Sequence, residues 1–97
     1  MNLTDRIPDL PARHYLNNGS PLTLTYQRIE DALWARDRGV PPFSNVLSHV
    51  PTSELERVMN RTVIAMAQAA IAGGVIDNAG GSTRLEIFKA YQNLGSH

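Results

Sequence analysis

Apolar residues in the third quarter of the chain recur with the spacing of one face of a helix. Residues 53–72 contain no Gly or Pro, and Gly73-Gly74 follows them directly. Leu55 and Val58 begin an apolar stripe that has polar residues opposite it. Such a stripe predicts an amphipathic helix, and a glycine just beyond it predicts a left-handed end. We therefore predict a helix over residues 53–72.

The beginning of this helix has the spacing of a capping box. Ser53 and Glu56 are three residues apart, so the Ser hydroxyl can accept from the amide of residue 56 while the Glu carboxylate accepts from the amide of residue 53. Glu54 and Glu56 also place negative charge in the first turn, where the helix dipole favours it. The pattern predicts that the helix begins at this box.

The second half of the predicted helix is apolar on nearly every side. From Val63 to Ala72, only Gln68 interrupts the apolar run. A helix of this kind should be surrounded, either by the other helices of its own chain or by a second subunit. The residues that would form such a core or interface are Met59, Val63, Met66, Ala67, Ala70 and Ile71.

Residues 22–38 also predict a helix, because their apolar side chains recur on one face. Ser20-Pro21 before them suits an N-cap followed by the first helical turn, where proline loses no hydrogen bond. Gly39 suits the residue just beyond the end. The chain therefore carries a start signal and a stop signal for this segment.

A third helix is predicted over residues 83–94. Thr83 and Glu86 have the spacing of a second capping box, and Gly95 follows the last apolar residue. One or two short helices, near residues 10–17 and 44–50, complete the pattern. The fold class is therefore all-α: a small helical bundle that forms a single domain over residues 1–97, a length typical of one domain.

Composition and charge exclude several classes of function. Nine Lys and Arg residues balance nine Asp and Glu residues, so a zero net charge removes the general attraction to nucleic acids and anionic membranes. The chain has no cysteine, which excludes disulfides, thiolate metal sites and thiol nucleophiles. Its N-terminus lacks a signal-peptide pattern, and no apolar run reaches the roughly 20 residues that span a bilayer. We expect a cytoplasmic protein.

No arrangement of residues indicates catalysis or metal binding. The three histidines, His14, His49 and His97, are far apart and lack the spacing of a helical metal site. No serine has the flanking glycines of a nucleophile elbow, and the acidic pairs fall on helix surfaces. We therefore expect no enzyme activity, no metal and no cofactor.

A glycine-rich segment precedes the third predicted helix. Free amides at a helix N-terminus attract anions, and Ser and Thr hydroxyls or an Arg would add donors. The alternative is a loop whose Ser or Thr caps its own helix, since the segment has no lysine at P-loop spacing. The residues of this candidate anion or nucleic-acid contact are Gly80, Gly81, Ser82, Thr83, Arg84 and Lys89.

Residues 64–94 resemble a helix-turn-helix, with a glycine-containing joint between two helices. The joint over residues 73–82 is longer than the three or four residues of the compact motif. Arg84 and Lys89 would be the main contacts to DNA, presented twice by a dimer. A connector between two bundle helices explains the same pattern.

Trp34 lies beside Arg36 and Arg38, a composition typical of protein-interface hot spots. It is one position off the apolar face of its predicted helix, so the alternative is a tryptophan at the edge of the core. Trp34 therefore joins the candidate interface residues.

The pattern favours a non-enzymatic protein-interaction module. One form of such a module is a self-associating accessory subunit, which would form a homodimer. The other is a small inhibitory protein that binds a larger protein assembly. Neutral mixed charge, the apolar helix and the lack of a catalytic set support this hypothesis. Base rates for small neutral helical proteins favour a phage or plasmid protein. The alternatives are a helix-turn-helix-like DNA-binding regulator acting as a dimer and an anion or nucleotide sensor.

Overall fold

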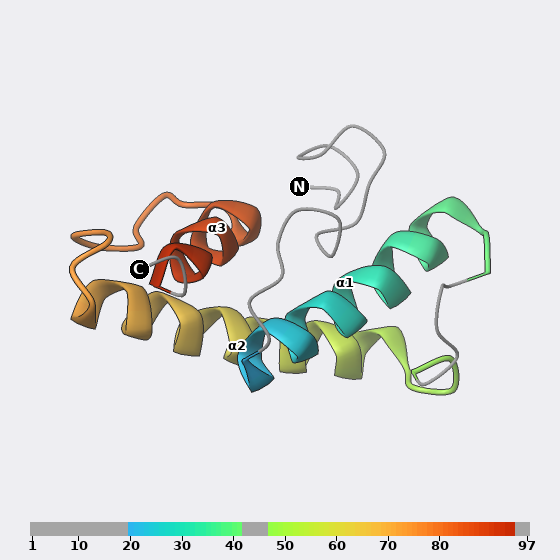
Figure 1. Ribbon diagram of the computed structural model, residues 1–97. Coiled ribbons are helices and arrows are strands. Elements are labelled where there is room, and N and C mark those ends of the chain that lie inside the picture. Colours follow the sequence, from blue (N-terminus) through green and yellow to red (C-terminus); the bar gives the residue numbers. More distant parts are fainter. Residues whose placement is uncertain (1–19, 42–46, 95–97) are drawn as a thin grey trace.

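The computed structural model describes residues 20–41 and 47–94. These residues form three helices: α1 (Pro21–Arg38), α2 (Thr52–Ala72) and α3 (Arg84–Leu94), with no strand in the described part (Figure 1). The predicted all-α fold class is therefore confirmed.

The predicted short helices have different outcomes. The one near residues 10–17 lies outside the described residues. Of the one near residues 44–50, the described part is a turn rather than a helix, in which the Val50 amide donates to the Leu47 carbonyl at 3.1 Å. The four described residues, 47–50, are followed directly by Pro51, and four residues are too few for a helical hydrogen-bond ladder.

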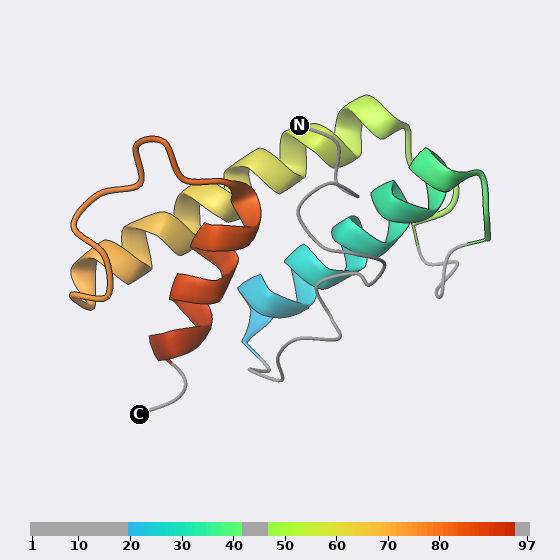
Figure 2. The ribbon, with the colours of Figure 1, turned by 90° about the horizontal axis from the view of Figure 1, so that it is seen from above.

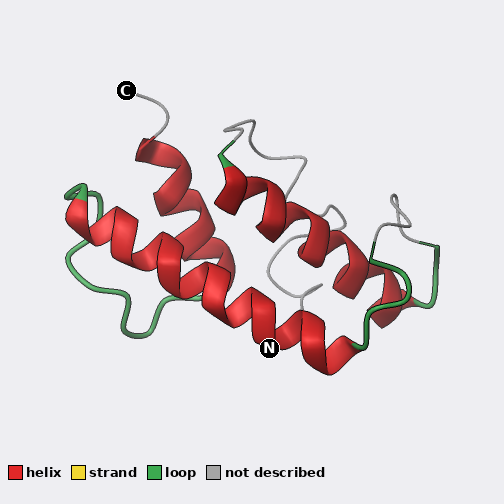
Figure 3. Cartoon of the chain, turned by 90° about the horizontal axis from the view of Figure 1, so that it is seen from below, coloured by secondary structure: helices red, strands yellow, loops and turns green. Residues whose placement is uncertain are grey.

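The longest helix, α2, is the centre of the arrangement and packs against both α1 and α3. Its 21 residues extend over about 31 Å, most of the 38 Å long axis of the molecule. Helix α1 lies along the N-terminal half of α2, and α3 lies along its C-terminal half (Figures 1 and 2). Both lie on the same side of α2, so neither of them covers its opposite side (Figure 3).

Both ends of α1 follow the sequence signals. The Ser20 side chain accepts from the Thr23 amide at 3.2 Å, and Pro21 occupies the first helical position. At the other end Gly39 adopts φ 68°, a left-handed conformation that glycine reaches without a steric penalty. Its amide donates to the Arg36 carbonyl at 3.3 Å and so closes the last turn.

The capping box predicted for α2 is wrong. The helix begins one residue earlier, at Thr52, and Pro51 occupies the N-cap position without a side-chain cap. The Pro51 carbonyl accepts from the amide of Leu55 at 3.1 Å, which places Ser53 inside the first turn. Glu56 instead forms a salt bridge with Arg84 of α3. A contact across 28 residues has therefore replaced the local one.

Helix α2 ends at the predicted pair of glycines. The left-handed residue is Gly74, with φ 75°. Gly73 has an ordinary negative φ, and a Cβ there would require the Leu94 side chain of α3 to shift. The pair thus both ends the helix and allows α3 to pack closely.

The capping box predicted for α3 is confirmed. The Thr83 amide donates to the Glu86 carboxylate at 2.8 Å, and the Glu86 amide donates to the Thr83 hydroxyl oxygen at 3.1 Å. The bond from the Thr83 amide is the largest cause of a lowered pKa for the Glu86 carboxyl, with smaller contributions from the Thr83 side chain and Lys89. The structure therefore favours the charged carboxylate at this helix end.

We predict a measurable acid dependence from this box. Because folding lowers the pKa of Glu86 from about 4.5, the charged carboxylate stabilises the fold above that pH, and the contribution is lost as the pH falls through the folded value. Thermal unfolding between about pH 6 and pH 3 should show a smaller loss of stability in Glu86→Gln than in the parent chain. An identical pH slope in the two proteins would contradict the prediction.

The hydrophobic core lies where the three helices meet. Its centre is a stacked pair, Tyr26 of α1 and Phe88 of α3, whose ring centroids are 4.3 Å apart and which are fully buried. The buried members of this core are Tyr26, Ile29, Ala32, Leu33, Leu55, Met59, Val63, Met66, Ala67, Leu85, Ile87 and Phe88.

Two polar bonds join α1 to α3 beside the aromatic pair. Gln92 Nε2 donates to the Thr23 hydroxyl oxygen at 2.7 Å, and both residues are buried. The Tyr91 hydroxyl donates to the Ser20 hydroxyl oxygen at 2.8 Å. These bonds satisfy polar groups that would be costly to bury alone, and they fix the start of α1 against the end of α3.

Candidate functional site

The residues predicted as core or interface separate into two groups. Ile71 is 42% exposed. Five others are buried within the monomer: Met59, Val63, Met66, Ala67 and Ala70. The structure therefore places these five in the core, where no second subunit can reach them without unfolding the chain.

Trp34 lies at the edge of the core and is half-buried. The Arg38 guanidinium lies 4.4 Å from its ring centroid, a cation–π contact one helical turn away. Arg36 takes a different direction, donating to the Thr52 hydroxyl oxygen at 3.0 Å and to the Leu47 carbonyl at 2.9 Å. The two arginines thus do not form one surface with the indole, and Arg36 instead fixes the turn that leads into α2.

The glycine-rich segment uses its own donors internally. The Gly80 amide donates to Asn78 Oδ1 at 3.0 Å, and the Ser82 amide donates to the Ala79 carbonyl at 3.1 Å. The Thr83 amide is bonded to the Glu86 carboxylate, and Arg84 is paired with a glutamate of α2. A carboxylate therefore occupies the position that a bound anion would take. Gly81 and Ser82 are exposed beside it.

The cations considered for DNA contacts are largely neutralised or separated. Arg57 is paired with Glu54, and Arg84 with Glu56. Lys89 is exposed on α3. The connector between the two helices runs over residues 73–83, much longer than the turn of a compact helix-turn-helix.

Metal and membrane sites are not found in the part of the chain that the structure describes. No group of three His, Asp or Glu side chains in residues 20–41 and 47–94 could hold a metal ion. His49 is exposed, whereas His14 and His97 lie outside these residues. None of the three helices has the length and apolar character needed to cross a bilayer.

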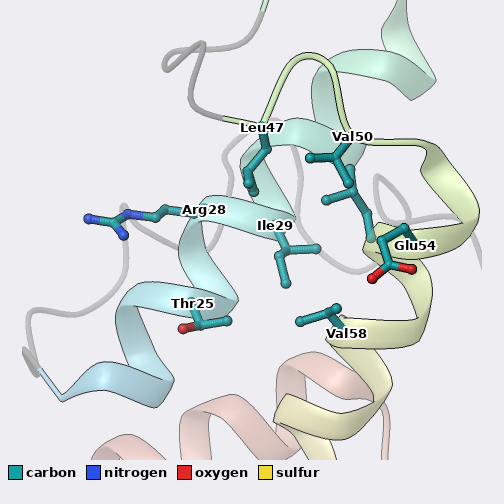
Figure 4. A pocket seen from close by; sticks show the side chains of 8 residues that line it. Thr25, Arg28, Ile29, Leu47, Val50, Glu54 and Val58 are labelled. Atoms are coloured by element: carbon teal, nitrogen blue, oxygen red, sulfur yellow. The ribbon is translucent and has the colours of Figure 1, made fainter.

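The described residues form a groove between α1 and α2. It encloses about 380 Å³ and is closed at one end by the turn over residues 47–50 (Figure 4). Its walls come from three segments that are separate in sequence. The lining residues are Thr25, Arg28 and Ile29 of α1, Leu47 and Val50 of the turn, and Glu54, Leu55 and Val58 of α2.

Two short side chains lie on opposite walls of the groove. Thr25 and Val58 stand across from each other where α1 and α2 diverge, and neither is long enough to fill the space between the helices (Figure 4). The Arg36 guanidinium donates to the Leu47 carbonyl, and this bond holds Leu47 at the end of the groove. The floor is Ile29, which is 3% exposed and belongs to the core.

The charges at the mouth of the groove are not balanced. Arg28 extends outward from α1, and among the described residues it has no ion-pair partner (Figure 4). Glu54 lines the groove from α2, and its carboxylate is already bonded to Arg57. The mouth therefore presents one uncompensated positive charge beside an apolar interior.

The groove has few polar side chains. Its polar side chains are one hydroxyl, one guanidinium and one paired carboxylate, with no base beside the hydroxyl to activate it. Sequence reasoning identified Val58 as an apolar helix position but did not predict a groove. The groove depends on how two helices diverge and on a turn docked between them, and neither leaves a local signal.

Comparison with protein-family models, with characterised proteins and with solved structures finds no match to this chain. The groove and its charges are therefore the features from which a function can be inferred.

Proposed function

We propose that the chain is a non-enzymatic protein-interaction module that binds an apolar segment of a larger protein in the groove between α1 and α2. The observation that carries this proposal is the apolar cavity of about 380 Å³, which falls in the size range of sites that hold a ligand. An open apolar cavity leaves apolar surface in contact with water, which costs a small domain stability. Binding a partner would fill the cavity and offset this cost.

A short amphipathic helix is the occupant that fits best. Strand addition needs an exposed sheet edge, and the described residues contain no strand. Polyproline segments bind to grooves lined by aromatic rings, whereas this groove is lined mainly by aliphatic side chains. A helix inserts apolar side chains at positions i and i+3 or i+4, and these match an apolar floor between two helices.

The partner helix should carry a carboxylate near its apolar side chains. Arg28 provides an uncompensated cation at the mouth, and Glu54 is compensated by Arg57. An acidic side chain beside Arg28 would gain a charge-assisted contact, whereas a basic one would be repelled. Charge thus supplies the selectivity, and the apolar floor supplies the affinity.

A display library of helical peptides tests this function directly. The parent chain should enrich peptides with two apolar residues one turn apart and a nearby Asp or Glu. Arg28→Glu should enrich peptides with Lys or Arg at that position, with about tenfold weaker binding to the original peptides. Arg61→Glu, the same charge reversal on α2 away from the groove lining, should bind the original peptides unchanged.

A second variant tests the contribution of the apolar cavity separately from that of the Arg28 charge. Val58→Trp should fill the cavity and weaken peptide binding at least about tenfold, while circular dichroism shows an unchanged helical content. No enriched peptide, or equal binding by Val58→Trp, would refute the proposal. Retention of the parent chain on heparin at about 50 mM salt would instead favour the nucleic-acid alternative.

A further inference from the structure

The side of α2 that faces away from α1 and α3 carries two large aliphatic side chains. Ile64 is 57% exposed and Ile71 is 42% exposed. They are seven residues apart, or two helical turns and about 10 Å along the axis, so they lie on the same side of the helix. Figure 3 shows α2 in front, with neither other helix over this side.

The two isoleucines and the residue between them form a strip along this side of the helix. Gln68 lies one helical turn from each isoleucine and is exposed. Single exposed aliphatic residues are ordinary, but two large ones seven residues apart lie on the same side, where one second helix can contact both.

We propose that this strip binds a second copy of the chain, with α2 packed antiparallel on α2 about a twofold axis next to Gln68. In this arrangement Ile64 of each copy contacts Ile71 of the other, so the same patch serves both copies, as a twofold dimer requires. The two Gln68 side chains meet near the axis, where each amide can donate to the other.

Charge determines the antiparallel direction. Arg57 and Arg61 both lie in the N-terminal half of α2, and the last turn of the helix has no basic residue. The carbonyls at the C-terminal end carry partial negative charge. Antiparallel packing brings Arg61 of one copy to this end of the other, near Gly74. Parallel packing would place arginine against arginine along the strip.

This interface does not rest on the groove. Leu55 and Val58 line the groove toward α1, whereas Ile64 and Ile71 are exposed and do not line it. It also replaces the earlier candidate set, because Met66 and Ala67 are core residues. The dimer can therefore form whether or not a partner helix occupies the groove.

Sedimentation equilibrium on the whole chain tests the dimer. The parent mass should approach twice 10.7 kDa as the concentration rises. Ile64→Glu and Ile71→Glu should each raise the dimer dissociation constant by about 100-fold or more, since every substitution occurs twice in a symmetric interface. Leu24→Glu is the matched control: Leu24 is 42% exposed on α1, and its variant should dimerise like the parent.

The direction of packing has its own test, because the chain has no cysteine of its own. Under mild oxidation, a mixture of Ile64→Cys and Ile71→Cys chains should form the mixed disulfide in preference to either symmetric one. Preferential cross-linking of Ile64→Cys with itself would overturn the antiparallel arrangement. A parent chain that stays monomeric up to about 1 mM would overturn the dimer, as would loss of dimer in Leu24→Glu.

Discussion

Phe88→Ala is expected to lower the free energy of unfolding by about 3–5 kcal/mol. Phe88 is completely buried and stacks on Tyr26 at 4.3 Å, so the substitution removes apolar burial and the aromatic contact and leaves a cavity. These two rings join α1 to α3.

Urea unfolding followed by circular dichroism measures the effect. A domain of this size has about 5–15 kcal/mol of total stability, so the variant should be partly unfolded or close to it in water. Phe88→Leu keeps most of the volume and should cost about 1.5 kcal/mol or less. A loss below about 1 kcal/mol for Phe88→Ala would show that the stacked pair is not the centre of the core.

Met66→Asp is expected to prevent stable folding, whereas Ile64→Asp should leave the monomer nearly as stable as the parent chain. Met66 has no exposed surface, so aspartate there loses about 2–5 kcal/mol of packing and adds an unpaired buried charge. Ile64 is mostly exposed, and a surface substitution usually changes stability by less than about 0.5 kcal/mol.

This pair of variants compares one substitution on two sides of one helix. Thermal unfolding at low protein concentration isolates the monomer, because dimer dissociation then no longer contributes. Similar losses at Met66 and Ile64 would mean that α2 is surrounded on all sides. A folded Met66→Asp chain would place the core elsewhere.

Helix ends were the most predictable part of this fold. Ser20 and Gly39 at α1, and Thr83 with Glu86 at α3, act through bonds within three or four residues, so the sequence contains the whole interaction. The same reasoning failed at Ser53, where Pro51 takes the N-cap position. At that helix end, the local capping bond and the distant Arg84 compete for the same carboxylate, that of Glu56.

The apolar half of α2 shows why the sites were less predictable. Its residues are hydrophobic on almost every side, so periodicity alone does not indicate which side faces the core. Val63 and Ile64 are neighbours with similar side chains, yet one is buried and the other is the most exposed large hydrophobic residue described. Only the positions of α1 and α3 distinguish them. The groove has the same origin, since three separate segments create it.

The order of the helices also bears on how the chain folds. Each helix packs on its neighbour in sequence, α1 on α2 and α2 on α3. Chains dominated by such local contacts fold fast, in about microseconds to milliseconds. The bonds from Thr23 to Gln92 and from Ser20 to Tyr91 instead span 69 and 71 residues. Closing that long loop costs chain entropy, so these bonds are expected to form last, after α1 and α3 have packed on α2.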